Sequence, residues 1–182
     1  MRKYSLYFIA SILCFTVISC SSDTEVPSIG SDPEAPVEMM EENLPDAPDF
    51  SLESLSGQNI SLADFKDKTL VIFFFGHNCP PCISAGPKLE SDLNQEFNSK
   101  DDFAMIGIDV WNGNVSQVEV FKNKSTATYA LGLKGSDVVK SFGSARDRLV
   151  VVNKEGKIAF NGKSVARNDL SEVKDILNTL LD

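Results

Sequence analysis

The chemistry of this chain is concentrated in the stretch "GHNCPPC", in which Cys79 and Cys82 are separated by two prolines. In an α-helix, residues i and i+3 lie on one face, and their Cα atoms are about 5 Å apart, within the span of a disulfide. A pair at the start of a helix can therefore close and open with little backbone motion. The spacing is compatible with a redox-active dithiol, a metal site or a structural crosslink.

The residues around the two cysteines indicate that they begin a helix. An apolar run ends at Phe75, Gly76 permits a sharp turn, and the two prolines suit a first helical turn. With Cys79 as the N-cap, its sulfur faces the positive end of the helix dipole, which favours thiolate over thiol. Because the prolines lack N–H groups, the amide of Cys82 is the best donor to that sulfur. We therefore expect Cys79 to be the nucleophile and Cys82 the resolving thiol, with His77, the single histidine, close enough to add charge or a hydrogen bond.

The first 19 residues have the build of a secretory signal, with a short basic start followed by an apolar run. The run from Tyr4 to Ser19 has 16 residues, fewer than the roughly 20 that a membrane-spanning helix needs. Its end, "VISC", resembles the lipobox of bacterial lipoproteins, so we expect cleavage before Cys20 and lipidation of Cys20. An ordinary signal peptide cut near Ser19 is the alternative. Ser21 stands where an inner-membrane retention signal has Asp, which favours the outer membrane, facing the periplasm.

Residues 20–46 are predicted to form a disordered tether. The stretch from Ser21 to Asp49 contains nine acidic residues and no Lys or Arg, together with several prolines and few apolar residues. So little apolar surface cannot offset the entropy cost of ordering, and like charges keep such a chain extended. A partner-binding role for the acidic run is the alternative. The formal net charge of -9 and the lack of a basic stripe exclude nucleic acid as a partner.

Residues 47–182 have the pattern of one α/β domain. Thr69–Phe75, "TLVIFFF", is a continuous apolar run, typical of a strand buried on both faces of a sheet. Similar runs lie at Phe103–Val110 and Arg148–Asn153, and "KEG" followed by "KIAF" predicts a hairpin. Helical patterns lie between and after these strands, at residues 82–97, 116–122, 136–142 and 169–181. Strands that alternate with helices favour an α/β layered fold.

Two segments of the chain resemble a known family. Ala47 to Cys82, "APDFSLESLSGQNISLADFKDKTLVIFFFGHNCPPC", resembles the first half of the thioredoxin-like (redoxin) periplasmic reductases of the TlpA/ResA kind, and Pro87 matches their helix proline. "FGSARDRLVVVNKEGKI" resembles their distal half. The resemblance implies a thioredoxin fold, with a central mixed β-sheet flanked by helices, an N-terminal hairpin and an inserted βα-type segment. It also implies a Cys79–Cys82 dithiol/disulfide and thiol-disulfide exchange.

The chain departs from this family pattern around the cysteines. Asn78 stands where the family usually has an aromatic residue, commonly Trp, and the single Trp111 lies elsewhere in the sequence. The acid of thioredoxin falls on Phe73 and a further family carboxylate falls on Ala85, so neither place can tune the buried thiol. The loop that faces the motif normally carries a cis-proline, but no proline follows Pro87.

The position of that missing proline falls on Asp147 or Arg148, depending on the direction of counting. A cis bond before another residue costs about 2.5–4 kcal/mol, so we expect a trans loop and a reshaped groove. Arg146, Asp147 and Arg148 are then charged neighbours of the disulfide, although such a loop can equally form only a surface ion pair. The predicted substrate-contacting residues are His77, Asn78, Pro80, Asp147 and Arg148.

The leading functional prediction is a membrane-tethered thiol-disulfide oxidoreductase that exchanges with protein disulfides. It needs no cofactor or resident metal. Its expected partners are protein thiols or disulfides, an upstream electron donor and, through the N-terminal lipid, a membrane, and we expect a monomer.

Four alternatives stay open. A structural disulfide is one, but it closes too small a loop to constrain the unfolded chain much. Zinc needs four ligands, more than His77 and the two cysteines provide, whereas a copper(I)-binding or chaperone module could use these three. A peroxiredoxin-like peroxidase shares the superfold and an arginine near the facing loop. Peroxiredoxins carry Thr or Ser three residues before the reactive cysteine, however, where this chain has Gly76.

Overall fold

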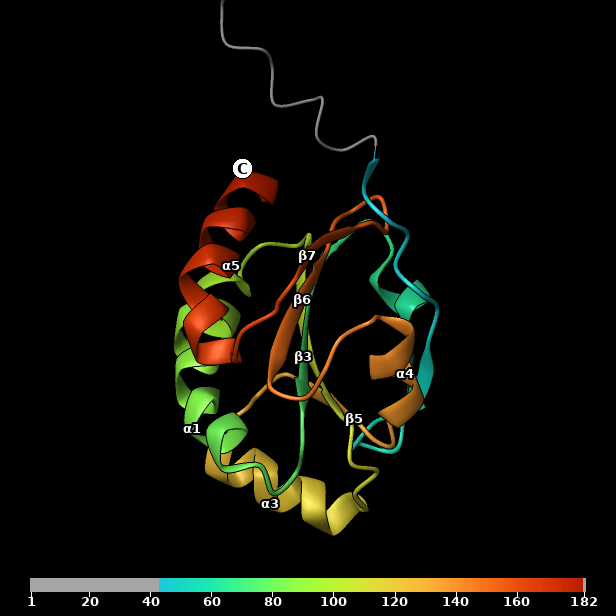
Figure 1. Cartoon of the computed structure of the whole chain (residues 1–182), viewed down its shortest axis with the longest axis vertical. Helices are drawn as coiled ribbons and strands as arrows, with labels where there is room; N and C mark the ends of the chain where they lie inside the picture. Colours follow the sequence, from blue (N-terminus) through green and yellow to red (C-terminus); the bar gives the residue numbers. More distant parts are fainter. Residues whose placement is uncertain (1–42, 182) are drawn as a thin grey trace, which may run out of the picture. The chain divides into compact units, whose positions relative to one another are not determined.

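The computed structural model describes residues 43–181, which are built around a five-stranded sheet (Figure 1). The predicted signal at residues 1–19, Cys20 and most of the tether predicted at residues 20–46 lie outside the described residues. The strand order is β5-β4-β3-β6-β7. β4 runs parallel to both β3 and β5, whereas β6 runs antiparallel to both β3 and β7, so the predicted mixed sheet is confirmed. The strands are β3 Thr69–Phe75, β4 Phe103–Asp109, β5 Ala130–Gly132, β6 Arg148–Val152 and β7 Ile158–Asn161.

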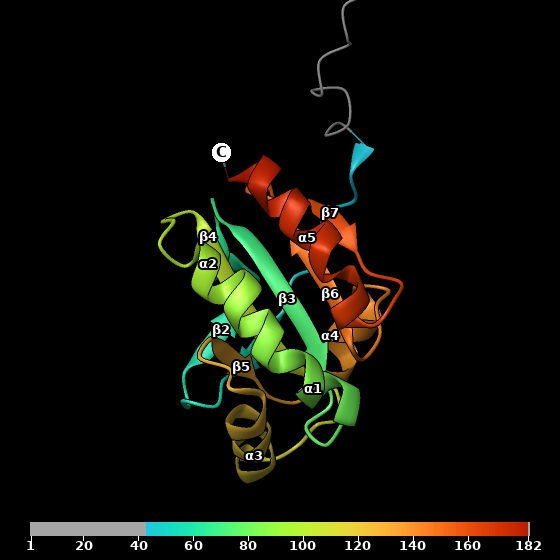
Figure 2. The ribbon, with the colours of Figure 1, turned by 90° about the vertical axis from the view of Figure 1, so that its left-hand side faces the viewer.

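The central strand β3 is buried along its whole length, as its continuous apolar sequence predicts. Its side chains point alternately to the two faces of the sheet, so Phe73 and Phe75 enter one apolar cluster while Ile72 and Phe74 enter the other. Figures 1 and 2 show α1 and α5 together on the first face, and α4 covers the opposite face. The bounds of these helices are α1 Pro80–Leu89, α4 Ser136–Ser141 and α5 Ala166–Leu180.

The helix predicted at residues 82–97 is present, but it begins at Pro80 and is not uniform. It continues from α1 through a π-helical turn, Glu90–Asn94, into α2, Gln95–Phe97. Pro87 lies inside α1 and brings no N–H to the helix ladder, and the wider turn follows it.

The π-helical turn places the carboxylate of Glu90 in the interior, where it accepts hydrogen bonds from the backbone and side chain of Thr128, at 2.9 and 2.6 Å. Burial raises the pKa of Glu90, but these bonds and those from two neighbouring amides outweigh it and leave the pKa below its ordinary value. The irregular turn is thus tied to the segment that leads into β5.

The N-terminal hairpin and the inserted segment are also confirmed. β1, Ser51–Glu53, pairs antiparallel with β2, Asn59–Ser61. After β4 the chain forms α3, Val115–Ser125, then β5 and α4. The short strand β5 has too few residues to show a periodicity, so its sequence gives no separate signal. No helix within residues 43–181 is long and apolar enough to span a membrane.

Candidate active site

The two cysteines of the motif form a disulfide at the start of α1, with their Cα atoms 5.3 Å apart. Cys79 is the N-cap residue, and the N–H of Cys82 donates to its Sγ at 3.3 Å, as predicted. The N–H of Cys79 donates to the carbonyl of Gly76 at 2.9 Å, which closes a tight turn after β3. Cys79 is 1% exposed and Cys82 is fully buried, so the disulfide lies almost entirely beneath the surface.

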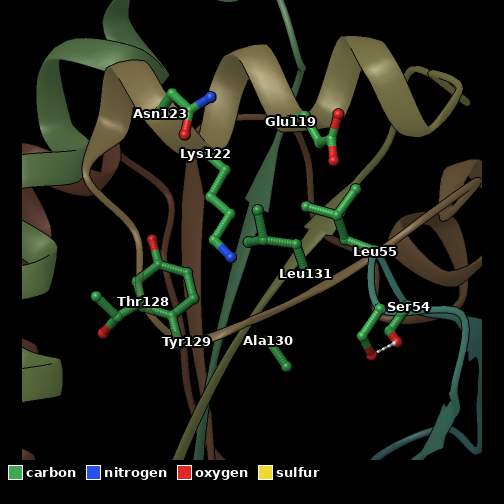
Figure 3. A pocket seen from close by; sticks show the side chains of 10 residues that line it. Ser54, Leu55, Glu119, Lys122, Asn123, Thr128, Tyr129, Ala130 and Leu131 are labelled. Carbon is green, nitrogen blue, oxygen red and sulfur yellow. Dashed lines mark hydrogen bonds between the residues drawn. The ribbon is translucent and has the colours of Figure 1, made fainter.

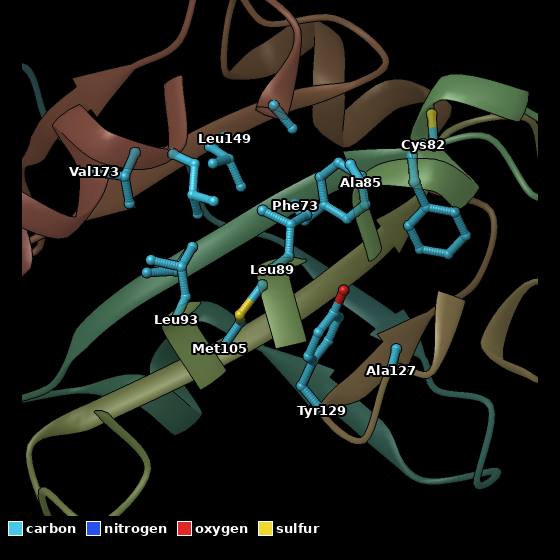
Figure 4. Packing of buried hydrophobic residues seen from close by; sticks show 14 of the residues in the cluster. Phe73, Cys82, Ala85, Leu89, Leu93, Met105, Ala127, Tyr129, Leu149 and Val173 are labelled. Atoms are coloured by element: carbon cyan, nitrogen blue, oxygen red, sulfur yellow. The ribbon is translucent and has the colours of Figure 1, made fainter. Parts of the chain in front are cut away.

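The interior behind the disulfide is apolar. Cys82, Phe73 and Ala85 belong to the same buried cluster, together with Tyr129 (Figure 4). The two positions at which related proteins carry an acid are therefore filled by hydrocarbon side chains here. Burial, with a contribution from the charge of Glu90, raises the pKa of Tyr129 above its ordinary value, so this phenol stays protonated. Because positions 73 and 85 hold Phe and Ala, neither position has a carboxylate that could take a proton from Cys82.

A buried carboxylate that the sequence did not reveal lies on the other side of the motif. Asp109 ends β4 directly opposite Phe75 and is fully buried. It accepts hydrogen bonds from the N–H of His77 at 3.0 Å and the N–H of Gly113 at 2.6 Å. It also accepts a longer bond, at 3.4 Å, from the N–H of Trp111. One carboxylate thus connects the turn before Cys79 to the loop after β4.

The imidazole of His77 is oriented by the same carboxylate. Its Nδ1 lies 3.2 Å from each oxygen of Asp109. Carboxylate oxygens accept hydrogen bonds, so the tautomer with its proton on Nδ1 suits this contact and leaves Nε2 for other partners. Two adjacent parallel strands, β3 and β4, end at the same edge of the sheet, and this is the signal that could have brought Asp109 and His77 together in advance.

Trp111, although distant from the motif in the sequence, lies beside it in the fold. A Cβ on Gly76 would lie 2.6 Å from Cδ2 of the indole, so the ring packs directly on the glycine. The indole meets the imidazole of His77 edge-on, with ring centroids 5.8 Å apart. The guanidinium carbon of Arg146 lies 4.9 Å from the indole centroid. The chain brings an aromatic side chain to the motif from another loop.

The loop at residues 146–148 lies next to the end of β3, as predicted, because the N–H of Asp147 donates to the carbonyl of Phe74 at 2.7 Å. Asp147 has a positive φ of 59° and is only 4% exposed. Burial raises the pKa of its carboxyl, and no group within residues 43–181 pairs with its Oδ1. The prediction that Asp147 contacts substrate is therefore not matched by an exposed side chain, and Arg146 is the exposed residue of this loop.

Three of the other predicted substrate-contacting residues adjoin the cysteines in the chain, and Arg148 begins β6 opposite Phe74. Asn78 and Pro80 are exposed, whereas His77 and Arg148 are half-buried. The guanidinium of Arg148 donates to the carbonyl oxygen of Asp147 at 3.0 Å. Of the five predicted contact residues, only Asn78 and Pro80 are exposed at the surface.

Two further features of the described residues lie outside the cysteine motif. Within residues 43–181, no three His, Cys, Asp or Glu side chains lie close enough together to hold a metal ion. A separate hollow lies between α3, β5 and the turn after β1, where Glu119, Lys122 and Leu131 line it (Figure 3). None of the residues that line it belongs to the cysteine motif.

Comparison with known proteins agrees with this geometry. The Redoxin family profile matches residues 43–180. The chain belongs to the Redoxin family. Among curated Redoxin relatives, it is 35% identical over 74 residues to the thioredoxin-like protein YneN of Bacillus subtilis, covering 41% of this chain and 42% of YneN. It is 26% identical over 118 residues to the thiol-disulfide oxidoreductase ResA of Halalkalibacterium halodurans, covering 62% of this chain and 63% of ResA. These matches span less than two thirds of the length of either relative.

Solved structures share the fold of this chain. A candidate protein disulfide isomerase from Bacteroides thetaiotaomicron has a TM-score of 0.68 at 26% identity, covering 75% of this chain and 88% of that one. The thioredoxin domain of a thiol-disulfide oxidoreductase from Bacteroides vulgatus has a TM-score of 0.63 at 22% identity, covering 75% and 96%. The predicted thioredoxin fold is therefore confirmed.

Proposed function

We propose that this Redoxin protein is a thiol-disulfide oxidoreductase that acts on protein disulfides. The observation that carries the proposal is the Cys79–Cys82 disulfide at the N-terminus of α1. The N–H of Cys82 and the positive end of the helix dipole both favour a thiolate on Cys79. The names of the ResA relatives and the fold support the same activity.

In the reducing direction, the thiolate of Cys79 attacks one sulfur of a substrate disulfide. A bond forms between Cys79 and that sulfur, and the other substrate sulfur leaves as a thiolate and takes a proton. Cys82 then attacks Sγ of Cys79, which restores the disulfide and releases the second substrate thiol. Two electrons and two protons pass from the protein dithiol to the substrate, and a dithiol donor protein of the cell restores the reduced state.

The residues around the disulfide have distinct proposed parts in this exchange. Asn78 and Pro80 are exposed on the rim, and the half-buried His77 and Arg148 lie beside them. These four side chains are the proposed contacts for the substrate. With Nδ1 bonded to Asp109, Nε2 is the ring nitrogen of His77 that can hydrogen-bond a docked substrate.

We also propose an extracytoplasmic location, with the chain anchored by a lipid on Cys20 and extended by its acidic tether, on the outer membrane facing the periplasm. The "VISC" sequence before residue 21 supports the anchor, and a disulfide persists in an oxidising compartment. Wild-type protein should sediment with membranes, and Cys20→Ala should release it into the soluble fraction. Wild-type protein in the soluble fraction would contradict the anchor.

The activity is tested by reduction of insulin disulfides with dithiothreitol as the electron donor. The rate of Cys79→Ser should fall at least about 100-fold, because Cys79 is the proposed nucleophile that forms the mixed disulfide. Cys82→Ser should instead accumulate a mixed disulfide on Cys79, visible by mass spectrometry. Unchanged insulin reduction by Cys79→Ser would sink the proposal. Titration of the same preparation with copper(I) tests the alternative of a copper-binding module. Tight copper(I) binding that is lost in His77→Ala, together with no reductase activity, would favour that alternative.

A further inference from the structure

An exposed aromatic and basic surface lies beside the disulfide, made by Trp111, Arg146 and the edge of His77. Trp111 is 42% exposed although its ring packs on Gly76. Arg146 stacks over the indole at 4.9 Å and is itself exposed. We call these three residues the Trp111–Arg146 surface.

The position of this surface is held by the fold and not by the indole alone. In the loop that carries Trp111, the backbone N–H groups of Trp111 and Gly113 donate hydrogen bonds to the fully buried Asp109. The next residue, Asn112, has a φ of 56°, and it both donates to and accepts from Ser136 of α4, at 3.0 and 3.2 Å. An aromatic group held in place loses little entropy when a partner docks on it.

The charge around this surface is locally positive, in contrast to the whole chain. Asp109, at the end of β4, and Asp147, just before β6, are 0% and 4% exposed, so neither presents its charge to solvent. The exposed Asp137, beside the Ser136 that bonds Asn112, is paired with Lys140. Within residues 43–181, Arg146, Arg148 and Arg167 form no ion pair with a carboxylate.

Arg167 extends the same positive charge to α1. Its guanidinium donates to the carbonyl of Ser84 at 3.4 Å, in the first half of that helix. These three arginines carry positive charge that no carboxylate within residues 43–181 neutralises in an ion pair, although the net charge of the chain is -9.

We infer that the Trp111–Arg146 surface docks the substrate polypeptide and selects segments that carry acidic side chains next to their cysteine. The indole supplies apolar contact for the docked segment, and the guanidinium groups pair with its carboxylates. Asp109 is a positioning residue for this surface. The inference rests on the proposed thiol-disulfide exchange and names its substrate class.

The test uses two peptides, each a pair of short chains joined by one disulfide, with Glu flanking every Cys in one peptide and Lys in the other. The purified, reduced chain is mixed with each at 0.15 M salt, and second-order reduction rates are compared. The small neutral hydroxyethyl disulfide serves as a third substrate. The net charge of the whole chain favours the Lys peptide, whereas the local surface favours the Glu peptide.

The wild-type chain should reduce the Glu peptide about fivefold faster than the Lys peptide. Arg146→Glu should abolish or reverse this preference, and the charge-matched control Lys66→Glu, on the loop before β3, should keep it. Trp111→Ala should slow both peptides about fivefold but not hydroxyethyl disulfide, and Trp111→Phe should restore most of the rate.

Equal wild-type rates on the two peptides, or a preference that survives in Arg146→Glu, would overturn the inference while leaving the exchange activity intact. Failure of the wild-type chain on hydroxyethyl disulfide as well would instead overturn the proposed function. Far-ultraviolet circular dichroism of each variant separates a lost contact from a lost fold.

Discussion

Two buried aspartates flank the end of the central strand, and their surroundings differ. Asp109 ends β4 on one side of β3, and Asp147 precedes β6 on the other side. Both are nearly inaccessible, at 0% and 4% exposed. Asp109 accepts hydrogen bonds from three backbone N–H groups and His77, whereas Oδ1 of Asp147 has no partner within residues 43–181.

The difference shows that burial alone does not decide what a carboxylate does. Hydrogen-bond donors around a buried carboxylate stabilise its negative charge. The carboxylate in turn holds together the chain segments that supply those donors. At Asp147, burial outweighs a backbone hydrogen bond from Ala166 and the charges of Arg148 and Arg146, and it raises the pKa of the carboxyl. We therefore expect Asp109 to stabilise the site and Asp147 to destabilise the fold at neutral pH.

The largest expected effect is that of Asp109→Ala. The substitution removes the acceptor for the N–H groups of His77 and Gly113 and leaves both without a hydrogen-bond partner. The free energy of unfolding should therefore fall by about 3–5 kcal/mol. Urea unfolding of the oxidised protein at pH 7 measures this change. Asp109→Asn keeps one acceptor oxygen and should lose less. A loss below about 1 kcal/mol for the alanine variant would show that Asp109 does not anchor these segments.

A smaller effect of opposite sign is expected for Asp147→Asn. Because burial raises the pKa of Asp147 in the folded state, the folded protein binds more protons than the unfolded chain. Wild-type stability should therefore fall as pH rises from about 3.9, the ordinary value for Asp, through the folded pKa, and then level off. Asn cannot ionise, so the variant should be more stable than the wild type at pH 7, by on the order of 1 kcal/mol.

Urea unfolding midpoints of Asp147→Asn and the wild type at several pH values measure that difference. It should grow with pH and vanish below the ordinary Asp pKa. A variant that loses stability relative to the wild type as pH rises would remove the contrast between the two aspartates.

The smallest expected effect is that of Gly76→Ala, which separates the packing of Trp111 from its anchoring by Asp109. The added Cβ would lie 2.6 Å from the indole, so the ring should swing out while its backbone bond to Asp109 stays. The lost contact with Arg146 should cost about 0.5 kcal/mol. Trp111 is the single tryptophan, so its fluorescence emission should shift to the red. Unchanged emission would mean that the ring does not rest on the glycine.

Much of the fold was predictable because it depends on local patterns. The apolar run of β3 required burial on both faces, and the two prolines with Cys79 specified the start of α1 to within two residues. The capping bond from Cys82 to the Cys79 sulfur followed from the missing N–H groups of the prolines. The three-residue strand β5 and the π-helical turn at Glu90 were not predictable, because neither has a periodicity of its own.

The sequence by itself determined the cysteine pair, its place at a helix N-terminus and the sheet beneath it, because each depends on neighbours a few residues away. Only the tertiary structure decided what surrounds the pair. Trp111 packs on Gly76 because Asp109, 32 residues after His77, binds the backbone N–H groups of both His77 and Trp111. The side chain of Asp147 turns inward because its backbone adopts a positive φ while bonding to Phe74 and Ala166. Contacts between distant segments select one loop path among many, and no local pattern encodes that choice.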